Sequence, residues 1–269
     1  MSNPLSISTR APKSFDKERI KAKTEFLKTV IIEQQNLLYA QRKHSLLIVL
    51  QGLDASGKDG LISNVFSGLN PLGCNVFAYK APTEDELAHD FLWRIHKNTT
   101  ARGMIHILNR SHYEDLLVPV VNGLLDKEKI NERIADVNNF ELLLKNHSTH
   151  VIKFYLHISK EEQKERLTER KTNPKKFWKH NDGDWATSKK WDDYMEAYQE
   201  IFKNCDTPEW NIIPSDQNWY KEYLVAEKVL KILEELKMSY PAKIEQQESE
   251  NTQQKKSKKR IPRNKSKKA

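Results

Sequence analysis

A glycine-rich octapeptide at residues 52–59, GLDASGKD, restricts the possible folds of this chain more than any other segment. Residues 46–50 before it form a continuous apolar run of strand length, and residues 61–69 after it have apolar side chains at helical spacing. Glycine suits positions 52 and 57, because the backbone must turn tightly there and point successive N–H groups at phosphate oxygens. The pattern predicts a strand, a phosphate-binding loop and a helix whose N-terminus adds positive potential.

The residues inside the loop indicate how it binds phosphate, and Lys58 is expected to neutralise the terminal phosphates. Position 59 usually holds a Ser or Thr that binds magnesium, but here it is Asp59. Carboxylates suit a hard cation, so Asp54 and Asp59 are the candidate metal ligands, directly or through water. Two alternatives remain open: Asp54 shapes the turn, and Asp59 is an acid favoured in the first turn of a helix. The loop residues expected to contact phosphate are Gly52, Ala55, Ser56, Gly57, Lys58 and Asp59.

The composition predicts one domain in a reducing compartment. A chain of 269 residues with 38% hydrophobic content can bury one substantial core. Cys74 and Cys205 are far apart and lack metal-ligand spacing, which argues against a disulfide scaffold and favours the cytoplasm. The N-terminus lacks the apolar core of a signal peptide, and no apolar stretch approaches the roughly 20 residues that span a bilayer. We therefore expect a soluble cytoplasmic protein with no membrane partner.

The net charge of +8 is concentrated at the C-terminus. Residues 241–269 contain ten Lys and Arg and three Glu, so they account for +7 of that charge. A Lys-rich segment with Pro, Ser and Gln cannot bury a core and is expected to be disordered. The sequence thus predicts a flexible N-terminus at 1–15, one domain at 16–238 and a disordered basic tail at 239–269. The tail is either a solubilising extension or an electrostatic anchor for a polyanion.

Strand-like and helix-like segments alternate along the chain. The predicted strands lie at about 46–51, 75–79, 104–109, 150–158 and 210–213. Residues 16–42 have the pattern of a helix docked against the core. This alternation predicts a parallel sheet covered on both faces. With the phosphate loop after the first strand, we expect a three-layer α/β/α sandwich of the P-loop kinase type, whose ligands lie at the carboxyl ends of the strands.

A second polar segment, LNRSHYED at residues 108–115, begins where the third predicted strand ends. Thymidylate-type kinases have an Asp-Arg pair at this place, and here Asn109 replaces that Asp. Arg110 keeps the arginine, whose planar fork binds phosphate oxygens bidentately. The alternative role of Arg110 is a structural ion pair with Glu114 or Asp115.

Basic residues predominate at 161–179, which predicts a helical lid near 161–195. Arg166 and Arg170 share one helical face at a spacing of four, and Pro174 forces the chain out of that helix. Kinases use such lids to exclude water and to bring positive charge to the transferring group. The alternative is a solvated charged helix. The lid residues expected to bind phosphate are Arg166, Arg170, Lys171 and Lys175.

Together these segments resemble the type-2 polyphosphate kinase family from about residue 42 to residue 231. The blocks GLDASGKDG, KAPTEDELAHDFLWR, LNRSHYEDLLV, KFYLHISKEEQKERLTER and WNIIPSDQNWY are similar to family blocks in the same order. The resemblance implies a P-loop kinase fold and phosphoryl transfer between inorganic polyphosphate and a nucleotide. By position, the catalytic residues that it implies are Asp54, Lys58, Asn109, Arg110 and Arg170.

The hexapeptide NRSHYE at 109–114 resembles the subgroup of the family that phosphorylates both AMP and ADP, and it places Glu114 near the acceptor. We expect in-line attack by an acceptor phosphate oxygen on polyphosphate, with magnesium or manganese as the metal and no phosphoenzyme. Adenine or guanine nucleotides are the expected partners, and a homo-oligomer, dimer or tetramer, is expected from the family. Lys80 and Arg94 are expected to extend the cationic track for a long polyanion, although Arg94 on a helix surface is the alternative.

Two other classes of protein share some of these features. An ATP-dependent nucleoside monophosphate kinase would have the loop, the arginine and the lid, but should lack the FLWR and WNIIPSDQNWY blocks. A non-catalytic protein that binds nucleic acid or another polyanion would explain the basic tail. It would not explain Lys58 in a strand–loop–helix, or a buried strand that ends at Arg110. The sequence therefore favours a polyphosphate kinase over both and argues against nucleic acid as a partner.

Overall fold

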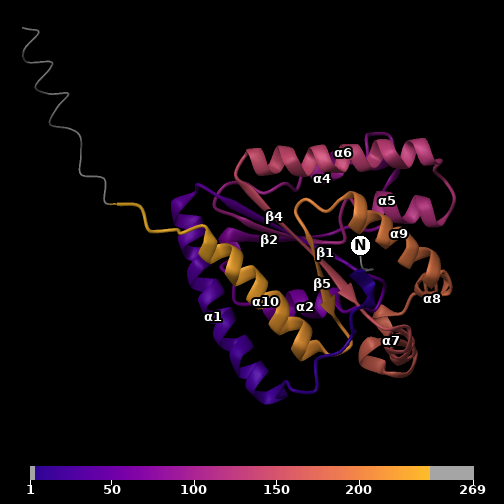
Figure 1. Ribbon diagram of the computed structural model, residues 1–269, viewed down its shortest axis with the longest axis horizontal. Coiled ribbons are helices and arrows are strands. Elements are labelled where there is room, and N and C mark those ends of the chain that lie inside the picture. Colours follow the sequence, from indigo (N-terminus) through magenta and orange to yellow (C-terminus); the bar gives the residue numbers. More distant parts are fainter. Residues whose placement is uncertain (1–3, 243–269) are drawn as a thin grey trace, which may run out of the picture. The chain divides into compact units, whose positions relative to one another are not determined.

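A five-stranded sheet forms the centre of the computed structural model, which describes residues 4–242 (Figure 1). The strand order is β2-β3-β1-β4-β5, and every neighbouring pair is parallel. The strands are β1 (Ser45–Gln51), β2 (Cys74–Ala78), β3 (Ile105–Asn109), β4 (Thr149–His157) and β5 (Trp210–Pro214). The predicted parallel sheet is confirmed, and each strand lies within one residue of its predicted bounds.

The apolar sequence of β1 explains why helices cover both faces of the sheet. Its residues are buried throughout. Leu46 and Ile48 belong to one apolar cluster, whereas Leu47 and Val49 belong to another. Successive side chains of a strand point to opposite faces, so a strand that is apolar at every position needs a layer of helices on each side.

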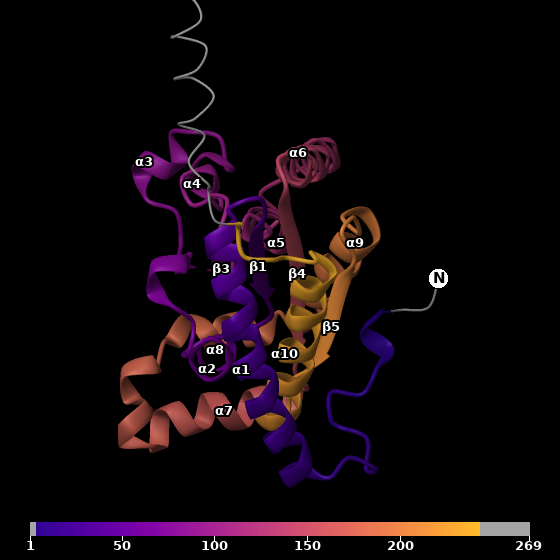
Figure 2. The ribbon, with the colours of Figure 1, turned by 90° about the vertical axis from the view of Figure 1, so that its left-hand side faces the viewer.

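Helices cover both faces of the sheet, as the two perpendicular views show (Figures 1 and 2). On one face lie α1 (Lys17–Gln41), α2 (Lys58–Val65) and α10 (Asn218–Glu235). On the other lie α5 (Glu114–Val121), α6 (Lys127–Asn146) and α9 (Trp191–Asn204). The three-layer α/β/α arrangement is therefore confirmed, and α1 is the helix expected at 16–42.

The shorter helical segments connect these layers. They are η1 (Pro4–Ser6), η2 (Pro71–Gly73), α3 (Glu84–Leu87), α4 (Trp93–His96), α7 (Lys160–Thr172), η3 (Pro174–Lys179) and α8 (Asp182–Lys189). Helix α7 follows the carboxyl end of β4 and ends before Pro174, as expected from the position of this proline in the sequence. Segments α7, η3 and α8 make up the region for which a lid was predicted.

Residues 4–15 contact the start of α10, which the sequence did not predict. The backbone oxygen of Thr9 accepts a hydrogen bond from the N–H of Asp216 at 3.1 Å. The N–H of Ala11 donates to Oε1 of Gln217 at 2.9 Å. These bonds attach the N-terminal segment to the loop that follows β5.

The predicted disordered tail at 239–269 lies, from residue 243 onward, outside the described residues. Among residues 4–242, no helix is both long and apolar enough to cross a bilayer. Cys74 and Cys205 are free thiols. Burial raises the pKa of Cys74 to about 11 and that of Cys205 to about 12, so neither is a thiolate nucleophile at neutral pH.

Candidate functional site

The loop between β1 and α2 has the backbone that phosphate binding requires. Gly52 has a φ of 143° and Gly57 a φ of 95°, values that favour glycine. A Cβ at position 52 would lie 2.9 Å from the backbone oxygen of Leu156, and one at position 57 would lie 2.3 Å from Nζ of Lys221. Helix α2 begins at Lys58, so the loop leads directly into the positive end of a helix.

Lys58 folds back onto this loop. Its Nζ donates to the carbonyl oxygens of Gly52 and Leu53, at 2.6 and 3.2 Å. Burial and then the charge of Arg110 lower the pKa of Lys58 to about 8. The amino group can therefore exchange its carbonyl partners for phosphate oxygens, which would also favour its charged form.

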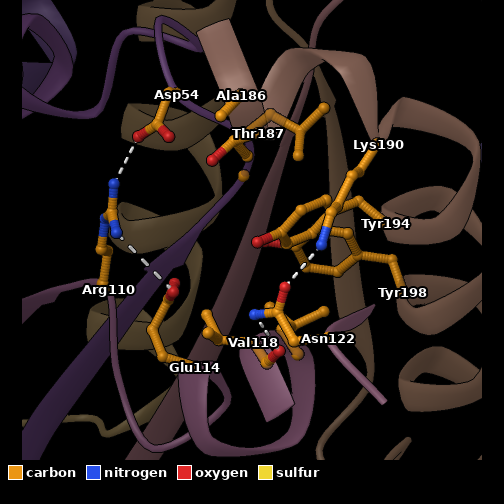
Figure 3. Close-up of a pocket in the computed structure, with 13 residues that line it drawn as sticks. Asp54, Arg110, Glu114, Val118, Asn122, Ala186, Thr187, Lys190, Tyr194 and Tyr198 are labelled. Carbon is orange, nitrogen blue, oxygen red and sulfur yellow. Dashed lines mark hydrogen bonds and ion pairs between the residues drawn. The ribbon is translucent and has the colours of Figure 1, made fainter. Parts of the chain in front are cut away.

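Arg110, at the end of β3, contacts two carboxylates. Its guanidinium forms ion pairs with Asp54 and, at 3.8 Å, with Glu114 (Figure 3). Burial disfavours the charge of Arg110, but Glu114 and Asp54 outweigh burial and raise its pKa. The φ of Arg110 is 64°, a conformation that costs a non-glycine residue about 1–3 kcal/mol and that clusters at functional sites. The ion pair with Glu114, which was predicted as an alternative, is thus present.

Asn109 and Asp59 join the end of β3 to the start of α2. Nδ2 of Asn109 donates to Oδ1 of Asp59 at 2.8 Å, and Nζ of Lys179 lies 3.5 Å from the other carboxylate oxygen. Burial alone would raise the pKa of Asp59, but Asn109 and Lys179 lower it on balance. Asp59 is therefore an ionised carboxylate at neutral pH.

Two cavities meet at Asp54 and Arg110. The larger, which we call the cationic cavity, has a volume of about 830 Å³, and its charged lining is Lys58, Lys80, Arg110, Arg170 and Lys179 with Asp54, Asp59 and Asp184. The smaller, which we call the tyrosine cavity, has a volume of about 270 Å³, and its lining includes Glu114, Leu117, Val118, Asn122, Lys190, Tyr194 and Tyr198 (Figure 3). Asp54, Arg110 and Thr187 line both cavities.

The two predicted metal ligands, Asp54 and Asp59, both line the cationic cavity. Between residues 4 and 242 there is no cluster of three or more His, Cys, Asp or Glu that could hold a metal by itself. Magnesium is commonly held by only one or two carboxylates, together with substrate phosphates and water. The pair of carboxylates therefore fits a metal that arrives with a phosphate substrate.

Arg170 lies in the cationic cavity, where Nη1 donates to Oδ2 of Asp184 at 2.5 Å. The pair connects α7 to α8. Burial and then the charge of Asp54 raise the pKa of Asp184, against the opposing effect of Arg170. The guanidinium of Arg170 is thus held at the cavity wall by an acid from the same region of the chain.

The geometry contradicts the prediction that Arg94 extends a cationic track. Its side chain is only 6% exposed. Nη1 donates to the backbone oxygen of Lys80 at 3.0 Å, and Nη2 donates to Asp115 at 3.0 Å. Arg94 is therefore a buried residue that contacts the backbone of Lys80, and it lines neither cavity.

Arg166 also lines neither cavity, because its guanidinium faces the loop backbone. Nη1 donates to the carbonyl oxygens of Ala55 and Ser56, at 3.0 and 3.3 Å. Nη2 donates to those of Ser215 and Asp216, at 2.9 and 3.0 Å. In this structure Arg166, for which contact with phosphate was predicted, instead contacts the backbone of the loop between β1 and α2.

Three further predicted residues lie outside both cavities. Ser56 is completely buried. Nζ of Lys171 lies 4.9 Å from the ring centre of Trp185, and Lys175 is exposed on η3. For Lys171 and Lys175, the predicted contact with phosphate requires a different arrangement of the lid.

Several lining residues were missed because no spacing links them to the loop. They are Lys179, Asp184, Thr187, Lys190 and Tyr198. They are brought to the loop by the packing of η3, α8 and α9, more than a hundred residues further along the chain. Their only local signal was the excess of basic and aromatic residues after Pro174.

A phosphate loop after the first strand of a parallel sheet, an arginine at the end of the adjacent strand and two adjoining cavities define a class of protein: the P-loop phosphotransferases of the nucleotide-kinase type. Sequence comparison identifies the family within this class. The model of the family described as Polyphosphate kinase 2 (PPK2) matches residues 14–241. The chain belongs to the polyphosphate kinase 2 family.

Characterised relatives agree with this assignment. The chain is 45% identical over 209 residues to an AMP/ADP-polyphosphate phosphotransferase of Meiothermus ruber, covering 77% of this chain and 78% of the relative. It is 39% identical over 222 residues to an ADP-polyphosphate phosphotransferase of Rhodopseudomonas palustris, covering 77% and 76%. The crystal structure of Polyphosphate Kinase 2 from Arthrobacter aurescens TC1 superimposes with a TM-score of 0.87 at 34% identity, covering 94% of this chain and 92% of that one.

Proposed function

We propose that this protein is a polyphosphate-dependent nucleotide kinase, which transfers the terminal phosphoryl group of inorganic polyphosphate to AMP and ADP. The observation that supports this most strongly is the junction of two chemically different cavities at Asp54 and Arg110. A phosphoryl group that moves between two substrates needs such a junction, with cationic side chains around the point of transfer.

Each cavity suits one substrate. The cationic cavity contains the phosphate loop and the side chains of Lys80 and Lys179, so its chemistry fits a long phosphate chain. The tyrosine cavity combines apolar walls with Tyr194 and Tyr198, so it fits a nucleoside. The nucleotide phosphate would then point toward Arg110, where the cavities meet.

The transfer needs charge stabilisation and no nucleophile from the protein. An oxygen of the acceptor phosphate forms a bond to the terminal phosphorus of polyphosphate, and the bond from that phosphorus to the bridging oxygen breaks. The shortened chain leaves with the electron pair. Lys58, Arg110 and Arg170 lower the barrier by neutralising charge on the transferring group and on the leaving oxygen.

Asp54 and Asp59 would hold a divalent cation, magnesium or manganese, together with phosphate oxygens. Such a cation neutralises phosphate charge and aligns the two substrates when it is bound. Asp54 also fixes the guanidinium of Arg110, and Asn109 fixes the carboxylate of Asp59. Asn109 thus supports a metal ligand rather than acting as one.

Glu114 is proposed to bear on the choice of acceptor. Its carboxylate lies in the tyrosine cavity, beside Arg110 and 3.2 Å from Nε2 of Gln51. Acceptance of both AMP and ADP is the activity in the name of the Meiothermus ruber relative. We extend this dual acceptance to the present chain.

The direct test is a pair of incubations of the purified protein with a magnesium salt and long-chain polyphosphate, one with AMP and one with ADP, both without ATP. A third incubation supplies ATP and AMP without polyphosphate, and chromatography follows the nucleotides. We expect both ADP and ATP to appear from AMP and polyphosphate. Product from ADP alone would contradict the dual acceptance. Product that requires ATP as donor would indicate an ordinary nucleoside monophosphate kinase.

A further inference from the structure

A lysine lies behind the phosphate loop, outside both cavities. Lys221, on α10, is only 1% exposed. Its Nζ donates to Oδ1 of Asn218 at 2.9 Å and lies 3.4 and 3.3 Å from the carbonyl oxygens of Ser56 and Gly57. The transfer described above makes no use of this buried cation.

The carbonyl contacts of Lys221 help to fix where the loop N–H groups point, together with Arg166 on Ser56 and the N–H of Leu61 on Gly57. In a planar trans peptide unit, the carbonyl and the following N–H point in opposite directions. A cation that holds the carbonyls of Ser56 and Gly57 therefore turns the N–H groups of Gly57 and Lys58 to the other side. Gly57 and Lys58 line the cationic cavity, where a phosphate would accept from these groups.

Arg166 holds the loop beside Lys221. A Cβ at Gly57 would lie 2.3 Å from Nζ of Lys221 and 3.3 Å from Nη1 of Arg166, so both cations approach the same residue. Arg166 comes from α7 and Lys221 from α10, which means that two separate helices converge on the loop carbonyls. Glycine at position 57 is needed for this approach as well as for its φ.

We propose that Lys221 is a positioning residue whose positive charge sets the affinity of the loop for the terminal phosphates of polyphosphate. The identity of that ligand rests on the proposed function, whereas the contact of Lys221 with the loop carbonyls is independent of it. The proposal also gives a role to the WNIIPSDQNWY block, which is followed directly by Lys221 and supplies Asn218 as its partner.

The charge of Lys221 titrates near neutrality, which provides a readout. Burial and then the charge of Arg166 lower its pKa to about 7. The other charged groups that face it are Lys58 on α2, Glu162 on α7 and Glu222 on α10. Lysine is charged below its pKa, so its help to an anion on the loop is present at pH 6 and is lost as the pH rises above 7. The interaction is reciprocal: if the charge of Lys221 strengthens the binding of an anion, then the bound anion raises the pKa of Lys221 by the same free energy.

The test is calorimetric titration of the full-length protein with inorganic tripolyphosphate, without nucleotide, at about pH 6 and about pH 8.5. Lys221→Met removes the charge at similar length, and Lys228→Met is the matched control, because Lys228 is exposed on the same helix. At pH 6 we expect Lys221→Met to bind about tenfold more weakly than wild type, which corresponds to a rise of about one unit in the pKa of Lys221 on binding. At pH 8.5 the difference should shrink to less than about twofold.

Titration of the ligand is the same in every variant. Lys58, whose pKa is about 8, is charged at pH 6 in every variant, and at pH 8.5 Lys221 is largely uncharged in wild type, so the coupling between the two lysines changes these ratios little. An equal Kd for wild type and Lys221→Met at pH 6, or the same loss at both pH values, would overturn the role of the charge. If Lys221→Met does not fold, Asn218→Ala should weaken binding about threefold at pH 6 only, because it loosens Lys221. Wild-type affinity of Asn218→Ala at both pH values would also overturn the proposal. Failure of wild type to bind tripolyphosphate would contradict the proposed function instead.

Discussion

Arg110 is the residue where backbone strain, charge and position coincide. It has a φ of 64°, and its guanidinium forms ion pairs with Asp54 and Glu114. We expect Arg110→Ala to lower kcat/KM with polyphosphate by at least about a hundredfold, the usual loss when a preorganised charge at a transition state is removed. Alanine keeps the unusual backbone conformation, so the change reports the side chain.

The matched control for that prediction is Arg102→Ala, because Arg102 is exposed shortly before β3. Its kcat/KM should stay within about twofold of wild type. A loss of less than tenfold in Arg110→Ala, in steady-state assays of nucleotide production, would show that Arg110 is a structural ion pair and no more.

For single residues, what the sequence can predict depends on whether the backbone or the direction of the side chain matters. The positive φ of Gly52 and Gly57 and the position of Lys58 at the start of α2 were predictable, because they depend on the local backbone. Arg94 and Arg166 were misjudged because composition gives the charge of a side chain but not its direction. Both guanidiniums are directed at backbone carbonyls, which leave no trace in a residue pattern.

Among the secondary-structure elements, α7 and α8 are joined by the ion pair between Arg170 and Asp184. If this region closes on the substrates as a lid, its arginine should act after binding. We expect Arg170→Ala to lower kcat by about tenfold or more and to change KM for the nucleotide little. Steady-state kinetics with both substrates varied would measure this.

Lys164→Ala is the control for Arg170→Ala, because Lys164 is an exposed cation on the same helix. It should turn over at the wild-type rate. If Arg170→Ala also did so, the assignment of a catalytic arginine to the lid would be wrong, and α7 would only support the loop through Arg166.

A buried ionic network links the segment just before α5 to α6 and β4. Glu141 accepts from Tyr113 at 2.9 Å and from Lys153 at 2.8 Å, and it accepts from Nε2 of His112 at 3.1 Å if that nitrogen is protonated. Burial would raise the pKa of Glu141, but His112 and Lys153 lower it on balance. A depressed pKa means that its contribution to stability is complete above the unfolded pKa of about 4.3 and is lost as the pH falls through the folded value.

We therefore expect Glu141→Gln to lower the free energy of unfolding at pH 7 by about 3 kcal/mol, because it removes the buried carboxylate that pairs with Lys153. Urea denaturation followed by circular dichroism would measure this. Glu132→Gln, on the exposed face of the same helix, breaks a surface pair with Lys129 and should cost less than about 1 kcal/mol. Equal losses in the two variants would contradict the account of the network.

The helices and strands could be predicted from the sequence better than the cavities could. The five strands lie within one residue of their predicted bounds, because apolar runs between polar turns are a local signal. The Pro174 break was predictable for the same reason. The two cavities were not, because they arise where η3, α8 and α9 pack against the loop, and such tertiary packing has no local signature.

At the scale of the whole molecule, the compact unit ends at Ser239, and most of the net charge lies beyond it. We expect a chain truncated after residue 242 to keep kcat within about twofold, because every cavity residue precedes that position. Loss of turnover on truncation would favour a polyanion-binding role for the basic segment. Parallel assays of full-length and truncated protein at equal concentration would decide.

The central claim is that the two cavities take different substrates on either side of Asp54 and Arg110. One lysine in each cavity allows a matched test: Lys179 lies 3.5 Å from Asp59 in the cationic cavity, and Lys190 donates to Asn122 at 2.6 Å in the tyrosine cavity. The measurement is KM for polyphosphate and KM for AMP in Lys179→Met and Lys190→Met. We predict that Lys179→Met raises only KM for polyphosphate and Lys190→Met only KM for AMP, each by about tenfold. A rise in KM for the same substrate in both variants would contradict the claim.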